Sequence, residues 1–284
     1  MCVAIPLYCQ IMKVAAVANA KGGSAKTTTC VNLAGAWAEL GYRLLLIDMD
    51  PQASASDWIG VERDDGKAFA EALMDEAERS GEEEGADPEF VGSLPKASCV
   101  TNLDIVSSGR WVGRAERAMG ATANGKLALS RVIAKLSQDR WDLLIIDCPP
   151  AVGLMTVNAL ASATDLIVPV EAHGMALSGV KTLMEVVGQI REGLNPNLSV
   201  LSLVACRATR TVLVRDVVQA LRERYGDLVA KTVIREGIRA AEAPSHHLPV
   251  TAYDSHSGVA EDYIALAMEL AEKLKLGRHA EAAV

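Results

Sequence analysis

The stretch Lys21-Gly22-Gly23-Ser24-Ala25-Lys26-Thr27-Thr28 decides the fold of this chain. It follows an apolar run at residues 14–18 and precedes a helical pattern that starts near Thr28, so the order is strand, glycine-rich turn and helix. Such a turn directs backbone N–H groups and the positive end of a helix at one point, which suits a chain of phosphates. Lys26 would then reach the β- and γ-phosphates, and the Thr27 hydroxyl would lie on Mg²⁺.

The turn departs from the standard P-loop pattern G-x-x-x-x-G-K-[ST], because Ala20 and Ala25 occupy its glycine positions. A second lysine, Lys21, lies five residues before Lys26. The stretch therefore resembles the deviant Walker A box K-G-G-x-G-K-[ST]-[ST] of the ParA/MinD superfamily of ATPases, from which only Ala25 departs. A glycine-rich turn that binds no ligand is the alternative.

The resemblance implies that the whole turn binds ATP: Lys21, Gly22, Gly23, Ser24, Ala25, Lys26, Thr27 and Thr28. In that superfamily the additional lysine reaches the phosphates of the ATP bound by the facing subunit. Lys21 is therefore expected to be catalytic across a nucleotide-sandwich homodimer, and Lys26 to be catalytic within its own subunit. Ala25 is expected to have a positive φ so that consecutive N–H groups converge on phosphate. An L-residue held there costs roughly 1–2 kcal/mol, so the predicted ATPase is a slow or weak one.

Composition favours an α/β protein. Hydrophobic residues make up 50% of the 284 residues and aromatic ones only 4%, which suits parallel strands that are buried on both faces and packed by alanine-rich helices. No apolar run in the sequence approaches the length of a membrane span. The cysteines are scattered without a C-x-x-C pair, which indicates free thiols in a reducing cytoplasm.

Apolar runs bounded by turn signals predict strands at residues 14–18, 43–48, 103–106, 143–147, 166–170 and 200–206, with late edge pieces at 232–234 and at Val250. Helical segments between them, such as 28–40, predict a doubly wound, mainly parallel sheet with helices on both faces, as in deviant P-loop NTPases. Ligands of such sheets bind beyond the carboxyl ends of the strands. We expect one ATPase domain over residues 12–276, a loose leader at 1–11 and a tail at 277–284, with translation starting at Met1 or Met12.

Two carboxylates end the second predicted strand, in Asp48-Met49-Asp50-Pro51-Gln52. Side chains at i and i+2 of an extended segment point the same way, so both can face the phosphates. The family carries a D-x-D-P-Q box here, whose second Asp positions the attacking water near Mg²⁺. The resemblance gives that catalytic role, and a place at the metal, to Asp50. Asp48 is expected not to contact the metal itself but to hold Thr27 or a metal-bound water.

The fourth predicted strand, Leu143-Leu144-Ile145-Ile146-Asp147, has the Walker B form. A buried strand of this kind delivers one fixed carboxylate to hydrated Mg²⁺. The pattern is weak alone, but Cys148-Pro149-Pro150 follows it and matches the family's D-x-P-P, which turns beside the γ-phosphate and senses the nucleotide state. Asp147 is therefore expected at the metal, with Pro149 supporting the turn behind it.

The resemblance continues to about Leu270. Residues 166–171 and 176–180 resemble the family's fifth strand and its following helix, and residues 233–245 resemble the I-P-R-x-V-R-x-x-E-A-P-S segment of Soj-type ParA proteins. Relatives have a proline that lies against adenine where this chain has Arg235. For that reason we assign no residue to adenine.

Charge is unevenly distributed along the chain. The net charge of −8 argues against a protein broadly coated with DNA. Residues 207–239, however, contain eight basic and four acidic side chains, and such a stripe binds phosphates without sequence preference. In Soj-like relatives, arginines that match Arg210 and Arg239 contact DNA. The alternative is a solvated helix face that carries i,i+4 ion pairs.

Residues 61–90 have the opposite character, with twelve acidic and three basic side chains. We predict a short helix at 68–78 and an exposed loop at 79–88. Acidic runs are usually solvated surface. The other interpretation is a docking face for a basic partner segment, since ParA relatives are stimulated by the basic tail of a ParB-type protein.

These features together predict a ParA/Soj-like ATPase with ATP and Mg²⁺ as cofactors. ATP would drive homodimerisation, the dimer would bind double-stranded nucleoid DNA in the cytoplasm without sequence preference, and slow hydrolysis would release it. DNA or another cargo would be partitioned, with a ParB-like or other adaptor as partner and without a membrane. One alternative is a MinD-like ATPase that cycles on a membrane, although bulky apolar residues are few after Leu276. The other is a regulator or scaffold with a degenerate P-loop, in view of Ala25.

Overall fold

The computed structural model describes residues 12–61, 64–79, 85–173 and 176–277. The expected leader at 1–11 and most of the expected tail lie outside the described residues. The fold is built on a seven-stranded sheet in the order β3-β4-β2-β5-β1-β6-β7. Its strands are β1 (Lys13–Val17), β2 (Leu44–Asp48), β3 (Lys96–Ala97), β4 (Leu103–Val106), β5 (Leu143–Asp147), β6 (Asp165–Glu171) and β7 (Ser199–Cys206).

All neighbouring strands are parallel except β3, which pairs antiparallel with β4 at the sheet edge. The expected doubly wound, mainly parallel α/β fold is confirmed, and so are the six main strands, to within a residue or two at their ends. In the centre of the sheet, Asp147 of β5 is in register with both Asp48 of β2 and Val17 of β1. The segments that follow β1, β2 and β5 therefore leave the sheet side by side.

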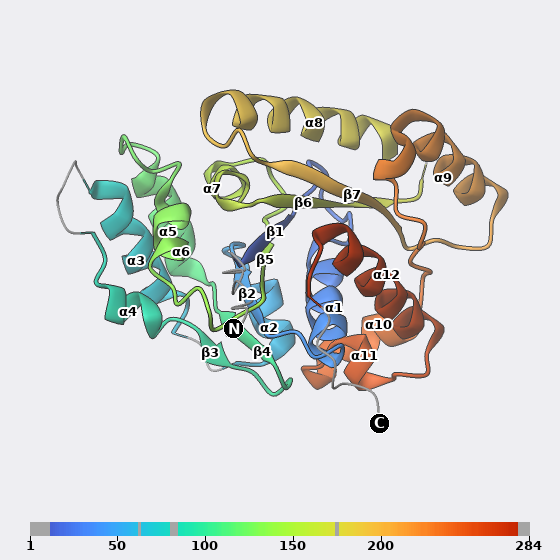
Figure 1. Cartoon of the computed structure of the whole chain (residues 1–284), viewed down its shortest axis with the longest axis horizontal. Coiled ribbons are helices and arrows are strands. Elements are labelled where there is room, and N and C mark those ends of the chain that lie inside the picture. Colours follow the sequence, from blue (N-terminus) through green and yellow to red (C-terminus); the bar gives the residue numbers. More distant parts are fainter. Residues whose placement is uncertain (1–11, 62–63, 80–84, 174–175, 278–284) are drawn as a thin grey trace, which may run out of the picture.

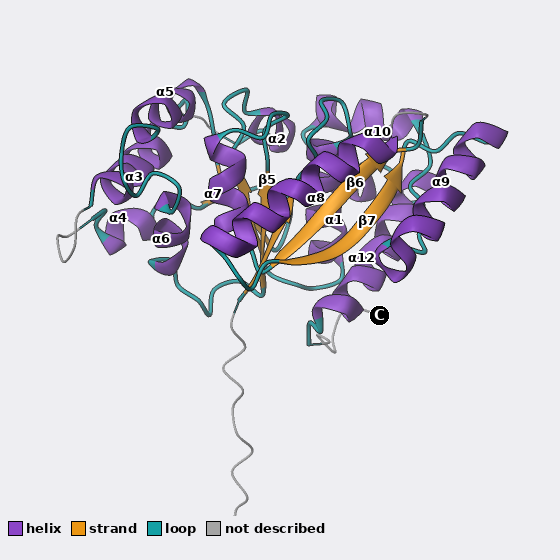
Figure 2. Ribbon diagram, turned by 90° about the horizontal axis from the view of Figure 1, so that it is seen from above, coloured by secondary structure: helices purple, strands orange, loops and turns teal. Residues whose placement is uncertain are grey.

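Helices cover both faces of the sheet (Figures 1 and 2). Side chains alternate along β1: Ala15 and Val17 pack in one core layer, while Val14 and Ala16 pack in the other. The first layer is closed by α1 (Lys26–Glu39), α2 (Ser54–Ile59), α10 (Ile238–Glu242), α11 (Val250–Tyr253) and α12 (Gly258–Leu274). The second is closed by α3 (Lys67–Glu78), α4 (Pro88–Gly92), α5 (Arg110–Met119), α6 (Ala128–Ala134), α7 (Leu154–Ser162) and α8 (Ala176–Gly193). The remaining long helix, α9 (Val212–Tyr225), flanks the sheet edge formed by β7 (Figure 1).

The late edge strands predicted at residues 232–234 and at Val250 are wrong. The first segment follows the end of β7 without forming a strand. The Ile234 N–H donates to the Ala205 oxygen at 2.9 Å and the Ile234 oxygen accepts from the Ala208 N–H at 3.0 Å, next to an isolated bridge between Ala208 and Arg235. Val250 instead begins α11 directly after Pro249, and its backbone N–H donates to the Asn32 Oδ1 of α1 at 2.6 Å. The apolar residues of both segments are buried, as their pattern predicts. Burial against α1 or against the end of β7 does not, however, require that a segment pair as a strand.

The acidic segment is only partly as expected. The helix predicted at 68–78 is present as α3. The loop predicted at 79–88 is not uniformly exposed, because Ala86 is 1% exposed and packs in the core. Residues 80–84 lie outside the described part of the chain.

No helix in the described residues has the length and apolar character needed to cross a membrane.

Candidate functional site

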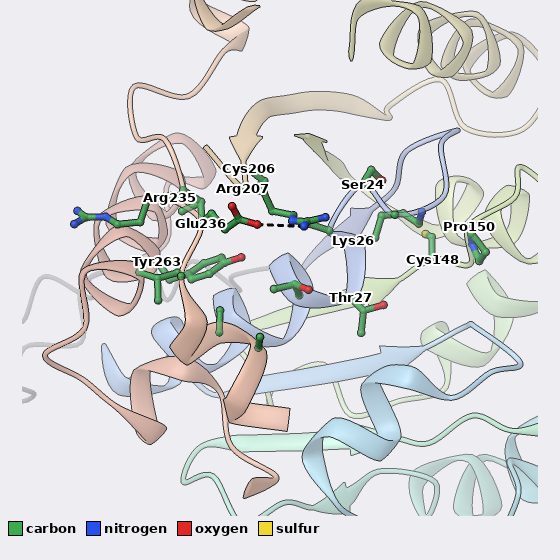
Figure 3. A pocket seen from close by; sticks show the side chains of 18 of the residues that line it. Ser24, Lys26, Thr27, Cys148, Pro150, Cys206, Arg207, Arg235, Glu236 and Tyr263 are labelled. Atoms are coloured by element: carbon green, nitrogen blue, oxygen red, sulfur yellow. Dashed lines mark hydrogen bonds and ion pairs between the residues drawn. The ribbon is translucent and has the colours of Figure 1, made fainter. Parts of the chain in front are cut away.

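A cavity of about 450 Å³ opens at the carboxyl ends of the central strands. One side is formed by the predicted turn and by the segments after β2 and β5, and the other by the segment after β7 and by α10 and α12 (Figure 3). The first side contributes Gly23, Ser24, Ala25, Lys26, Thr27, Thr28, Asp50, Cys148 and Pro150. The second contributes Cys206, Arg207, Ile234, Arg235, Glu236, Gly237, Ala240, Ala241, Val259 and Tyr263.

The turn that begins α1 has the backbone that the sequence predicted. Ala25 is the N-cap of α1 and lies in the left-handed region, with φ 61° and ψ 28°, so the expected positive φ is confirmed. Gly23 also has a positive φ, 74°. No side chain caps this end of α1, so the first N–H groups of the helix are left for a ligand in the cavity.

Lys26 is fixed at the start of α1. Its side chain is largely buried, and Nζ donates to the backbone oxygen of Lys21 at 3.0 Å. Burial lowers the pKa of Lys26, and the charge of Asp147 opposes that shift. A buried ammonium group in a cavity lined by backbone N–H groups is a strong partner for an anion.

Asp147 ends β5 as a buried carboxylate without a hydrogen bond. Its side chain is fully buried, and among the described residues neither carboxylate oxygen has a hydrogen-bond partner. Burial raises its pKa, followed by the nearby charge of Asp48, whereas the neighbouring Thr27 side chain lowers it without forming a full hydrogen bond. Such a group is costly unless a cation compensates it. Asp147 and Thr27 therefore fit a hydrated divalent cation such as Mg²⁺, which uses few protein ligands.

Asp48 does not hold Thr27, so that part of the expectation is wrong. Its carboxylate instead accepts hydrogen bonds from the backbone N–H of Asp50 at 3.0 Å and from the Ser56 N–H and hydroxyl at 2.9 and 2.7 Å. Burial raises the pKa of Asp48 to about 6, against these hydrogen bonds. The Ser56 hydroxyl in turn accepts from the N–H of Ser108 at 3.0 Å. Asp48 thus ties α2 and the segment after β4 to the loop that carries Asp50.

Asp50 lines the cavity, as predicted for a residue near the phosphates. One of its oxygens accepts from the Gln52 N–H at 2.9 Å, which orients the carboxylate. Pro149 is buried behind the loop, and its neighbour Pro150 is the proline on the cavity wall. Within the described residues no three His, Cys, Asp or Glu side chains form a metal cluster, which is compatible with a cation held mostly by water and phosphate.

Lys21 lies apart from these residues. It does not line the large cavity, and its Nζ is 2.8 Å from Nε2 of His173, which follows β6. No pattern in the sequence indicates this contact, because 152 positions separate the two residues.

On the second wall, residues 234–241 belong to the segment that resembles Soj-type proteins, but the sequence did not indicate the other residues of this wall. Tyr263 and Val259 come from α12, and Arg207 and Cys206 come from the end of β7. None of them belongs to a pattern that marks a binding site, and only the fold brings them to the turn. Arg235, which replaces the proline of relatives, lines the cavity but points away from the turn and pairs with Asp262 at 2.7 Å (Figure 3).

The two predicted DNA-contacting arginines are in different surroundings. Arg210 is exposed and lines a groove of about 680 Å³ beside α9, together with Arg215 and Arg222. Arg239, on α10, is paired with Glu242 at 2.8 Å and with Asp254 at 3.0 Å. Within the described part of the chain, neither Arg210 nor Arg215 is paired with a carboxylate.

The strained Ala25 supports a prediction. We expect Ala25→Gly to bind ATP more tightly, by up to about ten-fold, because it removes from the cavity wall a methyl group that would crowd the phosphates. Titration calorimetry measures the affinity. Ala53→Gly is the matched control, since Ala53 has a φ of 57° as the N-cap of α2 but does not line the cavity. ATP binding that is unchanged or weaker in the Ala25 variant alone would contradict this account.

This chain is similar to known proteins along most of its length. A family model described as an AAA domain matches residues 12–200. The sporulation initiation inhibitor protein Soj of Bacillus subtilis is 36% identical over 261 residues, which cover 91% of this chain and 98% of Soj. The chromosome partitioning protein ParA of Caulobacter vibrioides is 33% identical over 275 residues, which cover 96% of this chain and 98% of ParA.

Solved structures show the same fold. Cobyrinic acid a,c-diamide synthase from Mycobacterium smegmatis, with bound ADP and magnesium, has a TM-score of 0.76 and 28% identity, and the match covers 94% of this chain and 97% of the synthase. The septum site-determining protein MinD from Pyrococcus horikoshii, complexed with Mg-ADP, has a TM-score of 0.70 at 22% identity, with 91% of this chain and 96% of MinD covered. At that identity the likeness to MinD concerns the fold alone.

Proposed function

Because this chain belongs to the ParA/MinD family of P-loop ATPases, we propose that it is a partition ATPase that dimerises with ATP and binds DNA without sequence preference. One observation carries the proposal: the uncapped start of α1, the buried ammonium of Lys26 and the unpartnered carboxylate of Asp147 meet at one cavity. The first two suit the phosphates of a nucleotide, and the third suits the cation that accompanies them.

The side chains divide the work of hydrolysis among them. Lys26 and the N–H groups of the turn hold the phosphates and stabilise the charge that develops on them. Thr27, Asp147 and Asp50 would hold Mg²⁺, which would neutralise phosphate charge. Asp50, oriented by the Gln52 N–H, positions the attacking water. Hydrolysis is slow because positioning alone supplies most of the catalysis and Ala25 strains the turn.

The homodimer is proposed to enclose the nucleotides between its subunits, with Lys21 of each subunit on the phosphates bound by the other. Lys26 already lies at the cavity of its own subunit, whereas the Lys21 side chain stands outside it. A second lysine on the same turn, which does not line the cavity of its own subunit, can therefore serve a facing site across a two-fold axis.

DNA binding is proposed to centre on Arg210, with Arg215 and Arg222 along the same groove. Unpaired arginines on an exposed helix lose little when they exchange water for phosphate. Arg239 contributes less, because DNA must compete with Glu242 and Asp254 for its guanidinium group. The duplex would therefore lie along α9.

The DNA proposal has a direct test. Arg210→Glu should weaken ATP-dependent binding to an arbitrary duplex at least about ten-fold, because an attractive phosphate contact becomes repulsive, while ATP-driven dimerisation persists. Fluorescence anisotropy measures the binding, and Arg210→Ala should flatten the plot of log K against log salt by about one unit. Arg117→Glu makes the same charge change on α5, at the opposite end of the molecule (Figure 1), and should have little effect. Equal DNA binding by the two Glu variants would mean that the arginines of this groove are only solvated surface.

Partner and location follow as further parts of the proposal. Glu71, Asp75 and Glu78 lie exposed on α3, and burial together with the charges of Glu78 and Glu71 raises the pKa of Asp75. A basic segment of a ParB-like adaptor would relieve this repulsion between the carboxylates of α3.

We place the protein in the cytoplasm on the nucleoid, as one ATPase domain over residues 12–276. Leu274 and Leu276 are buried in the core, so these two side chains are not available to a membrane surface.

A further inference from the structure

Lys21 is folded back onto its own subunit at the end of β6. Its Nζ lies 2.8 Å from His173 Nε2, and the same ring nitrogen lies 3.4 Å from Glu171 Oε2. A lysine ammonium has only donors, so His173 Nε2 is the acceptor in this contact. The Glu171 carboxylate adds a negative charge on the same side of the ammonium.

The backbone of Lys21 is attached to the same strand. The Asn19 side chain accepts from the Lys21 N–H at 3.1 Å and donates to the Pro169 oxygen of β6 at 2.6 Å. From the other side, Gly179 of α8 packs so closely that a Cβ there would lie 3.6 Å from Lys21 Cβ. The side chain is therefore partly buried against β6, the segment after it and α8, all of the same chain.

Glu171 is also linked to the nucleotide cavity, through Arg207, which lines it. Its other oxygen pairs with Arg207 at 2.9 Å, and Arg207 pairs in turn with Glu236 at 3.2 Å (Figure 3). Arg207 is held at a φ of 52°, a left-handed conformation that L-residues seldom adopt. These ion pairs keep Glu171 in place between the cavity and Lys21.

We propose that His173 and Glu171 are positioning residues that hold Lys21 within its own subunit and so set the ATP concentration at which the protein dimerises. This rests on the proposed function, in which Lys21 acts on the nucleotide of the facing subunit. The ammonium group must leave His173 to reach that site. The intramolecular contact therefore opposes dimerisation, and its removal favours dimerisation.

The contact between Lys21 and His173 is tested on the full-length protein without nucleotide. Acetic anhydride labels exposed amines, and mass spectrometry gives the labelled fraction of Lys21 relative to Lys181, an exposed lysine of α8. His173→Leu removes the acceptor and should raise Lys21 labelling about five-fold, the factor expected for loss of one partly exposed charged contact. His173→Gln keeps an acceptor oxygen and should restore labelling to near the original level. Unchanged labelling in His173→Leu overturns the proposal.

The consequence for dimerisation is tested by light scattering against ATP concentration. The concentration for half-maximal dimerisation should fall about five-fold in His173→Leu and in Glu171→Gln, while ADP affinity of His173→Leu, measured by calorimetry, stays the same because His173 does not line the cavity. Glu185→Gln is the control, since it also removes a carboxylate from a lysine contact but lies on the exposed side of α8.

The outcomes separate the parts of the proposal. If Lys21 labelling rises but the ATP concentration for half-maximal dimerisation stays the same or rises, the claim that the contact opposes dimerisation is overturned. Failure of the unsubstituted protein to dimerise with ATP overturns the proposed function instead, and the labelling experiment still decides whether Lys21 is held.

Discussion

Lys21→Ala should abolish ATP-dependent dimerisation and leave ATP binding by the monomer largely intact. One charged contact to phosphate contributes about 1.5–3 kcal/mol, and a two-fold dimer loses it twice, so dimer affinity should fall by roughly 10²–10⁴-fold. Monomer binding is spared because the phosphates of the same subunit are held by Lys26 and the start of α1, and Lys21 does not line that cavity. Light scattering with ATP and Mg²⁺ follows the dimer, and calorimetry follows ATP binding.

Lys181→Ala is the matched control, because it removes an exposed lysine from α8 without touching the turn. It should dimerise like the unsubstituted protein. Normal dimerisation of Lys21→Ala would show that the sandwich arrangement is wrong. A loss of ATP binding by the Lys21→Ala monomer would show instead that this lysine serves its own nucleotide.

Asp50→Ala should have the opposite effect and trap an ATP-bound dimer. Without the carboxylate to position water, phosphate release should fall by about 10²–10⁴-fold, the usual contribution of a positioned acid–base group. Assembly should persist, since Lys21, Lys26 and Asp147 are unchanged. A phosphate-release assay gives the rate, and light scattering after dilution gives the dimer lifetime.

Asp50→Asn separates charge from shape. The amide oxygen can still accept from the Gln52 N–H, the partner of the carboxylate, so the loop should keep its structure while hydrolysis is lost. Hydrolysis at the original rate by either variant would assign the water to another residue. A dimer that no longer forms in Asp50→Asn would place Asp50 in assembly rather than in catalysis.

The main features of the site were predictable because they are local. The strand before Lys21, the turn and the start of α1 lie within one short stretch, and a backbone that passes from strand to helix through Gly23 and Ala25 has few allowed conformations. The positive φ of Ala25 follows from this and is observed. Asp50 and Asp147 were predictable for a related reason. Both follow buried parallel strands, and strands paired in register bring their carboxyl ends to one edge.

Hydrogen-bond partners were harder to predict than positions. Asp48 was correctly expected behind Asp50, yet its carboxylate binds Ser56 rather than Thr27. A strand pattern indicates which face a side chain points to, but a buried carboxylate accepts from whichever N–H or hydroxyl the neighbouring loop presents. The apolar character of Val250 likewise indicates that its side chain is buried, although the segment is a helix packed on α1 and not a strand.

The sequence by itself determined the turn, the order of strands and helices, and the chemical groups placed at the ends of the central strands, because each depends on short-range backbone sterics and on the burial of apolar runs. Only the tertiary structure decided what closes the other side of the cavity and what Lys21 contacts. Tyr263 of α12 and Arg207 after β7 reach the cavity by packing of distant elements, and His173 meets Lys21 because β6 lies beside β1 in the sheet. Contacts of this kind arise between surfaces formed only after the sheet and its helix layers have assembled, and no local pattern encodes them.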